Sequence, residues 1–221
     1  MNPALVLTSL YTQNIEPYIS GNANPITDAL AKDGIVRAAR SLRKAVSHGA
    51  DIDAREDMAI ASTLGGLALA NAKLGTVHGF AGVLGGMFET APHGAICAAL
   101  LPPTFQKNAE RLSELVESGG EAGGIDVATA KVRLARMREV SCLVTGNSEA
   151  QWEDGVAWLR SLVKDLQVPG LNSLCKLDVI GGMTQKQKDD CIQATAGASS
   201  TKGNPLVLSE ADLRAILEES L

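Results

Sequence analysis

Apolar residues recur every three or four positions along most of the chain, which is the spacing of the buried face of an α-helix. The apolar stretch 5–19 predicts a first short helix, which ends at a turn over 20–25 that contains Gly and Pro. The segment 26–46 has apolar residues at helical spacing with basic residues between them, so it predicts a second, amphipathic helix. Asp51 or Asp53 can cap a third helix, which is apolar on most sides and is therefore expected to be a central element.

The rest of the chain continues the helical pattern. A Gly-rich segment at 117–125 predicts a flexible surface loop. Three further helices are expected at about 126–144, 148–166 and 184–196. Ser209 can cap a terminal helix, because Asp212 stands three residues later, at the spacing of a capping box. No strand alternates with these helices, so no βαβ unit is expected, and the chain is predicted to be a single all-α helical bundle over 1–221.

Composition and charge agree with the all-α class and reduce the kinds of partner that the protein is expected to bind. Aromatic residues make up only 3% of the chain, which suits close-packed helices better than sheets. A net charge of −5 without a block of Lys and Arg argues against nucleic acid or an anionic membrane as partners. No signal peptide or membrane-spanning stretch is expected. The four cysteines form no C-x-x-C pair and are interpreted as buried thiols of a cytoplasmic protein; they are Cys97, Cys142, Cys175 and Cys191.

The most specific pattern is GTVHGFAGVLGGMFETAPHG at 75–94. Four further pieces match the same family in order: IEPYIS at 15–20, ANPITDAL at 23–30, GGLALANA at 65–72 and SSTKGNP at 199–205. With these motifs the chain resembles, over essentially its whole length, the C-terminal half of iron-containing alcohol dehydrogenases and maleylacetate reductases. The resemblance implies a dehydroquinate-synthase-like helical domain that normally follows an N-terminal α/β domain for NAD(P). Only the helical half, without a nucleotide-binding domain, is expected here.

The resemblance also implies a metal site and shows where this sequence departs from it. The family holds a divalent iron or zinc ion with an Asp and a His on one helix and two further His residues. His78 and His93 stand at the last two of these positions, with one extra residue between them. Ser9 stands where the Asp belongs and Gln13 where the first His belongs. Gly82 replaces another His that many members carry and that is credited with proton relay.

Two imidazoles without a carboxylate make a poor site for a divalent ion, so neither a metal nor another cofactor is expected. A residual zinc or iron ion on His78 and His93 is the alternative. The favoured hypothesis is a cofactor-free, non-redox enzyme or binder, of isomerase, lyase or cyclase type, that acts on a small organic molecule in the old active-site cavity. His78 or His93 would be the general acid or base, and Gln13, Ser9 or Tyr18 would donate hydrogen bonds.

Two other hypotheses stay open. The chain could be a remnant or split half of an NAD(P)- and metal-dependent dehydrogenase or reductase, with the nucleotide-binding half as a separate subunit. It could also be a non-catalytic pseudoenzyme, in which His78 and His93 only hydrogen-bond Ser9, Gln13 and the backbone. Under each hypothesis, the apolar surface that packs on the nucleotide domain in the family predicts a homodimer or larger assembly.

Overall fold

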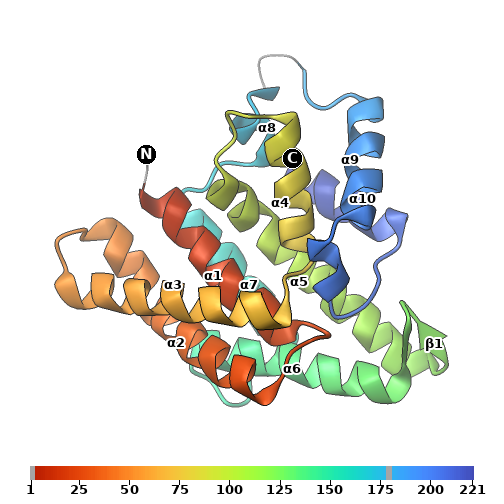
Figure 1. The fold of residues 1–221 in the computed structure, drawn as a ribbon, viewed down its shortest axis with the longest axis horizontal. Helices are drawn as coiled ribbons and strands as arrows, with labels where there is room; N and C mark the ends of the chain where they lie inside the picture. The colour runs from red at the N-terminus through yellow and green to blue at the C-terminus, as the bar shows by residue number, and fades with distance from the viewer. Residues whose placement is uncertain (1–2, 178–180) are drawn as a thin grey trace.

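A computed structural model describes residues 3–177 and 181–221, apart from the side chains of residues 3–8 and 10. Within these residues the chain forms ten α-helices, one short 3-10 helix and one two-stranded hairpin, which confirms the predicted all-α class (Figure 1). None of the described helices is long and apolar enough to cross a membrane. The elements are α1 Pro3–Ile19, α2 Pro25–Ser47, α3 Ile52–Ala72, α4 Thr76–Met87, α5 His93–Ser118, β1 Glu121–Ala122, β2 Ile125–Asp126, α6 Val127–Thr145, α7 Trp152–Asp165, α8 Leu171–Leu174, α9 Gln185–Gly197, η2 Ser200–Gly203 and α10 Glu210–Ser220.

Helices α1 and α5 are the central elements: α1 packs against α2, α3, α5 and α6, and α5 also packs against α4, α6, α7, α8 and α10 (Figure 1). Tyr11, Ile15 and Tyr18 of α1 are each at most 1% exposed. The expectation that the third helix is central is wrong: α3 buries one stripe and leaves Leu67 49% exposed. Its other faces are apolar in sequence but lie at the surface, so periodicity alone could not place this helix.

Asn14 of α1 sets how closely the first three helices approach each other. A Cβ atom at Gly34 of α2 would lie 1.9 Å from the Oδ1 atom of Asn14, and one at Gly65 of α3 would lie 2.9 Å from its Nδ2 atom. The same Nδ2 atom donates a hydrogen bond to the carbonyl of Ala61 at 3.0 Å. Glycine at both positions therefore lets α2 and α3 close on α1.

Helix α5 carries half of the candidate site and continues through Pro102 and Pro103. A proline inside a helix removes an N–H donor and crowds the carbonyl four residues earlier. Both prolines are buried here, and the neighbouring Leu100 and Phe105 are 0% and 1% exposed. Burial of this apolar segment offsets the missing hydrogen bonds, so the helix stays continuous.

The segment 117–125 is not the flexible loop that its composition predicts. Helix α5 extends to Ser118, and β1 then pairs antiparallel with β2. The four glycines of the segment all have positive φ; they are Gly119, Gly120, Gly123 and Gly124. Because glycine adopts this conformation without steric cost, the segment forms a tight hairpin. The N–H of Val207 donates to the carbonyl of Gly123 at 2.9 Å and fixes the hairpin to the segment before α10.

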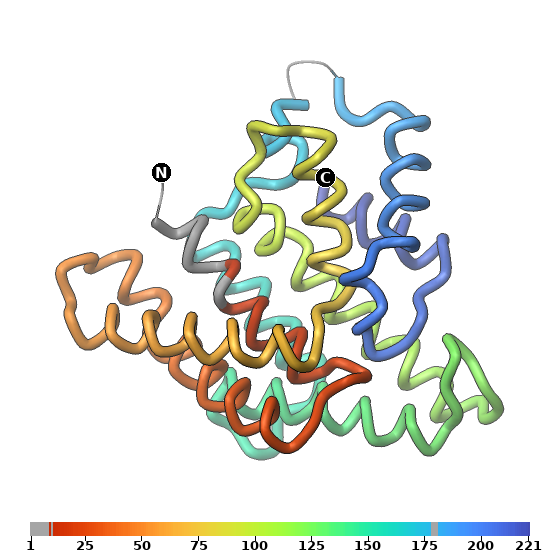
Figure 2. Tube along the Cα trace, viewed as in Figure 1, coloured from red at the N-terminus to blue at the C-terminus, as the bar shows by residue number. Residues whose placement is uncertain are grey.

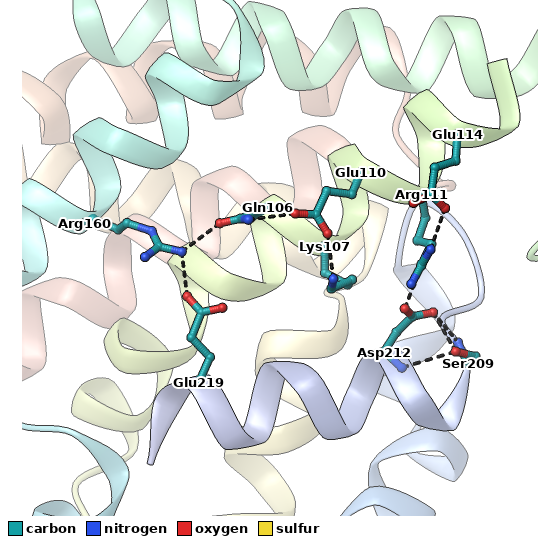
Figure 3. A network of polar contacts seen from close by, with 9 residues as sticks. All are labelled: Gln106, Lys107, Glu110, Arg111, Glu114, Arg160, Ser209, Asp212 and Glu219. Atoms are coloured by element: carbon teal, nitrogen blue, oxygen red, sulfur yellow. Dashed lines mark hydrogen bonds and ion pairs between the residues drawn. The ribbon is translucent and has the colours of Figure 1, made fainter. Parts of the chain in front are cut away.

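Helix α10 is fastened to α5 and α7 by a polar network (Figure 3). Ser209 caps the helix in a capping box with Asp212, which confirms the predicted start. Arg111 of α5 donates to Asp212 at 2.7 Å, and Arg160 of α7 donates to Glu219 at 2.6 Å. Because Gln106 and Arg111 belong to α5, this network joins the middle of α5 to α7 and α10 (Figure 3).

Candidate functional site

The first turn of α4 is capped by side chains from distant parts of the chain, because Gly75 offers no cap of its own. The N–H of Val77 donates to Oε1 of Glu16 at 2.8 Å, and the N–H of Thr76 donates to Oδ1 of Asn204 at 3.2 Å. A carboxylate at a helix N-terminus also interacts favourably with the helix dipole. Helix α1 and the segment after α9, which passes beside the start of α4 in Figure 2, thus fix this helix in the fold.

The same carboxylate orients His78. Oε2 of Glu16 lies 2.5 Å from Nδ1 of His78, and the two side chains are only 3% and 6% exposed. The proton between them is held on Nδ1 by the carboxylate acceptor, which leaves Nε2 as the second functional atom of the ring. Within the described residues, Nε2 is buried and has no hydrogen-bond partner. The ring of His78 is therefore held in one orientation with one nitrogen uncommitted.

Helix α5 brings two further side chains to this nitrogen. His93 is the first residue of α5 and Cys97 follows one turn later, so the two share a helix face. Nε2 of His93 lies 3.6 Å from Sγ of Cys97, and the rings of His78 and His93 are 5.5 Å apart between centroids. One nitrogen of each histidine and the sulfur all lie within 4.8 Å of one another. We refer to His78, His93 and Cys97 as the His–His–Cys cluster.

The cluster shifts the protonation of its own members. Burial lowers the pKa of His78, but the Cys97 thiol and the Glu16 carboxylate raise it by more, to about 10. The contact with Cys97 likewise raises the pKa of His93. Burial raises the pKa of the Cys97 thiol, but the two imidazoles lower it by more, so the net shift is downward. The surroundings therefore favour a thiolate beside protonated or metal-bound imidazoles.

The structure places the other predicted site residues on α1. Ser9 is buried and Gln13 half-buried, and with Glu16 they lie on one face of α1, because four and three residues separate them. Their role as hydrogen-bond donors stays a prediction. Tyr18 is differently placed: its hydroxyl donates to Glu139 of α6, and the guanidinium of Arg136 lies 4.3 Å from its ring centroid. The Tyr18 hydroxyl is therefore committed to α6 and is not part of the cluster.

Two members of the site were missed in the sequence. Glu16 is the only charged residue in α1, and a single carboxylate in an apolar helix was a usable signal. The spacing of the four cysteines predicts buried thiols and does not single out Cys97. The i, i+4 spacing of His93 and Cys97 is the signal that indicates a shared helix face.

A helical domain that brings together two histidines of a Gly-rich signature is what the resemblance to iron-containing alcohol dehydrogenases implies for their C-terminal half. The profile of the Fe-containing alcohol dehydrogenase family, C-terminal, matches residues 10–221, and the chain belongs to this family. The resemblance found in the sequence is thereby confirmed.

The chain is similar to several alcohol dehydrogenases. It is 46% identical over 114 residues to 1,3-propanediol dehydrogenase of Klebsiella pneumoniae, which covers 50% of this chain and 29% of that protein. It is 33% identical over 212 residues to long-chain-alcohol dehydrogenase 1 of Geobacillus thermodenitrificans, which covers 94% of this chain and 47% of that protein. A crystal structure of 1,3-propanediol oxidoreductase superimposes with a TM-score of 0.80 at 29% identity, over 99% of this chain and 51% of that one. The chain thus spans about half the length of these relatives or less.

The His–His–Cys cluster fits a divalent metal ion. Nε2 of His78 is buried and unpartnered, a carboxylate supports the opposite nitrogen of the ring, and the lowered pKa of Cys97 favours the ligating thiolate. The sequence offered two donors, His78 and His93, and the fold places a third possible donor, Cys97, beside them. Dinucleotides such as NAD(P) typically bind to βαβ units. The described part of the chain forms no such unit, because β1 and β2 have only two residues each.

Proposed function

We propose that this chain forms the substrate-binding half of an enzyme that acts on a small alcohol or the corresponding aldehyde at the His–His–Cys cluster. The observation that carries this proposal is the buried, unpartnered Nε2 atom of His78, fixed by Glu16 beside His93 and Cys97. Relatives support the substrate class: they are named for 1,3-propanediol, long-chain alcohols and, in Bacillus subtilis, choline. All of these molecules carry a hydroxyl group.

Each residue of the site has a distinct task in this proposal. A divalent ion, when bound, would polarise the substrate oxygen as a Lewis acid. Glu16 keeps the His78 ring from turning, so this side chain needs no reorganisation when a ligand arrives. The exposed His93 and the bare face of α4 leave an approach from solvent, since a Cβ atom at Gly82 or Gly86 would meet nothing within 4 Å. A nicotinamide nucleotide would have to be held by a different half of the enzyme.

Ligand-observed NMR on the purified, metal-loaded chain tests the proposal with 1,3-propanediol, choline and a longer primary alcohol as probes. We expect saturation transfer to at least one alcohol, and loss of that transfer in His93→Ala, whose side chain is exposed and can be removed without opening the core. His48→Ala is the matched control, because His48 is also exposed and lies at the end of α2. Equal transfer in both variants, or none in the wild type, would contradict the proposal.

A second candidate function is the cofactor-free acid–base enzyme that the sequence favours. The buried Glu16–His78 pair at 2.5 Å supports it, because a carboxylate beside an imidazole is a common proton-transfer device. Ser9 and Gln13 also support it, as neutral groups at two positions that bind metal in the family. Substrate turnover without NAD(P) and in the presence of a chelator would favour this candidate, whereas dependence on nucleotide or metal would exclude it.

A further inference from the structure

We propose that the His–His–Cys cluster is a zinc-type metal site in which Cys97 is a thiolate ligand. Cys97 thereby compensates for the two ligands that Ser9 and Gln13 no longer provide. The proposal uses the same residues as the proposed function, but its test reads metal binding and not turnover, so the two can fail separately. It concerns a ligand that the resemblance to the family did not indicate, since only His78 and His93 stand at matching positions.

The distances suit an ion with few, short bonds. Zinc binds imidazole nitrogen at about 2.0–2.1 Å and thiolate sulfur at about 2.3 Å, so tetrahedral donors lie roughly 3.3–3.8 Å apart. The separation of 3.6 Å between Nε2 of His93 and Sγ of Cys97 already falls in this range. The three donor atoms lie within 4.8 Å of one another, so no pair is more than about 1 Å wider than this range.

The surroundings of His78 are those of a metal ligand. Zinc-bound histidines usually donate their other N–H to a carboxylate, which orients the ring and makes it a stronger donor. Glu16 is this carboxylate for His78, and the N–H of Val77 donates to the second oxygen of Glu16 at 2.8 Å. A thiolate at Cys97 and the carboxylate of Glu16 together balance the charge of a divalent ion. The buried Nε2 of His78, which the described residues leave without a partner, is then satisfied by the metal.

The donor set favours zinc over iron. Thiolate is a soft ligand that suits zinc, whereas non-haem iron(II) is typically held by two histidines and a carboxylate. Here the carboxylate of Glu16 lies behind His78 and is occupied by two hydrogen bonds. Three protein ligands leave a fourth tetrahedral position open, as in catalytic zinc sites, and this position can accept an oxygen of a substrate or water.

Cobalt(II) titration of the metal-stripped chain tests the ligand assignment, because a thiolate ligand gives a sulfur-to-cobalt charge-transfer absorption in the near ultraviolet. We expect one ion per chain, this absorption in the wild type, and its loss when zinc is added. Cys97→Ser should lose the absorption and bind cobalt at least ten-fold more weakly. Cys142→Ser is the matched control and should behave as the wild type. The thiol of Cys142, on α6, contacts the carbonyls of Ser148 and Ala150 in the loop that follows this helix.

Further variants keep the proposal testable if Cys97→Ser fails to fold, which circular dichroism would reveal. His93→Ala changes an exposed side chain and should also weaken cobalt binding at least ten-fold. Glu16→Gln keeps an acceptor for Val77 and should weaken binding by about 10- to 100-fold. Cys97→Asp creates two histidines and a carboxylate, so the ratio of zinc to iron(II) affinity should fall at least ten-fold. No binding by the wild type, or cobalt binding without the absorption and equal in Cys97→Ser, would overturn the proposal.

Discussion

The carboxylate of Asp57 joins α3 to α2 through three side chains. Arg40 donates to it at 2.7 and 2.9 Å, Arg37 at 3.0 Å and Ser41 at 2.5 Å. The hydrogen bonds from Arg40 lower the pKa of Asp57 from 3.8 to about 2, against the opposing effect of burial and with help from Ser41. A carboxyl group with a lowered pKa stabilises the folded state above its unfolded pKa, and this contribution is lost as the pH falls through the folded value.

We therefore expect Asp57→Asn to lower the free energy of unfolding by about 1–2 kcal/mol at pH 7, a value reduced for the partial solvent screening of the arginines. The difference between wild type and variant should shrink as the pH falls from 3.8 towards 2, because Asp57 then becomes protonated in both states. Urea unfolding at pH 7 and near pH 2.5 measures it. A difference that stays constant over this range would show that Asp57 acts through packing and not through its charge.

At the scale of single residues, the family resemblance predicted only part of the candidate site. His78 and His93 were assigned as a pair, and they do lie together. Cys97 lies outside the family motifs, and Glu16 lies in one of them, IEPYIS at 15–20, without an assigned role. Glu16 lies 62 residues before its partner His78, and no spacing rule links two side chains over that distance. The Glu16–His78 contact exists only because α1 passes the start of α4.

Among the elements, α4 has two glycines with opposite surroundings. A Cβ atom at Gly79 would lie 2.1 Å from Oγ1 of Thr201, whereas one at Gly82 would meet nothing within 4 Å. Gly79→Ala should lower the free energy of unfolding by about 1–3 kcal/mol, because α4 would be pushed away from η2. Gly82→Ala should raise it by about 0.5–1 kcal/mol, because alanine is the better helix former at an open position.

Urea denaturation of these two variants compares them within one helix. Stabilisation by Gly79→Ala would contradict the close packing of α4 on η2. The pair also separates two uses of glycine that look identical in the Gly-rich signature. One permits a tertiary contact, and the other leaves a bare helix face beside the His–His–Cys cluster.

Helix α10 offers a second comparison within one element, visible in Figure 3. Asp212 is 5% exposed and accepts hydrogen bonds from the N–H of Ser209 in the capping box and from Arg111, so Asp212→Asn should cost about 1–3 kcal/mol. The side chains of Glu219 and Arg160 are 45% and 50% exposed, so Glu219→Gln should change stability by less than about 0.5 kcal/mol. Thermal or urea unfolding measures both. Equal effects would mean that burial does not set the strength of these ion pairs.

For the whole molecule we retain the proposal of a homo-oligomer. Large apolar side chains are exposed on the α2–α3 hairpin, where Ile26 is 74% and Ile52 is 69% exposed. Burial of such side chains between copies is favourable, so we expect light scattering to give at least twice the chain mass of 23.0 kDa. A single species of 23.0 kDa across a range of concentrations would contradict the proposal.

The sequence by itself determined the all-α class, several helix boundaries and the family, but it did not assign α4 or α5 as helices. Periodicity and caps depend on residues within one or two turns, so the start of α10 at Ser209 and Asp212 could be read directly. The tertiary structure alone decided that α1 and not α3 is central, that 117–125 forms a hairpin, and that Cys97 joins the two histidines. The place of α1 and the meeting of His78 with the side chains of α5 depend on contacts between residues far apart in the chain, which no local spacing rule predicts.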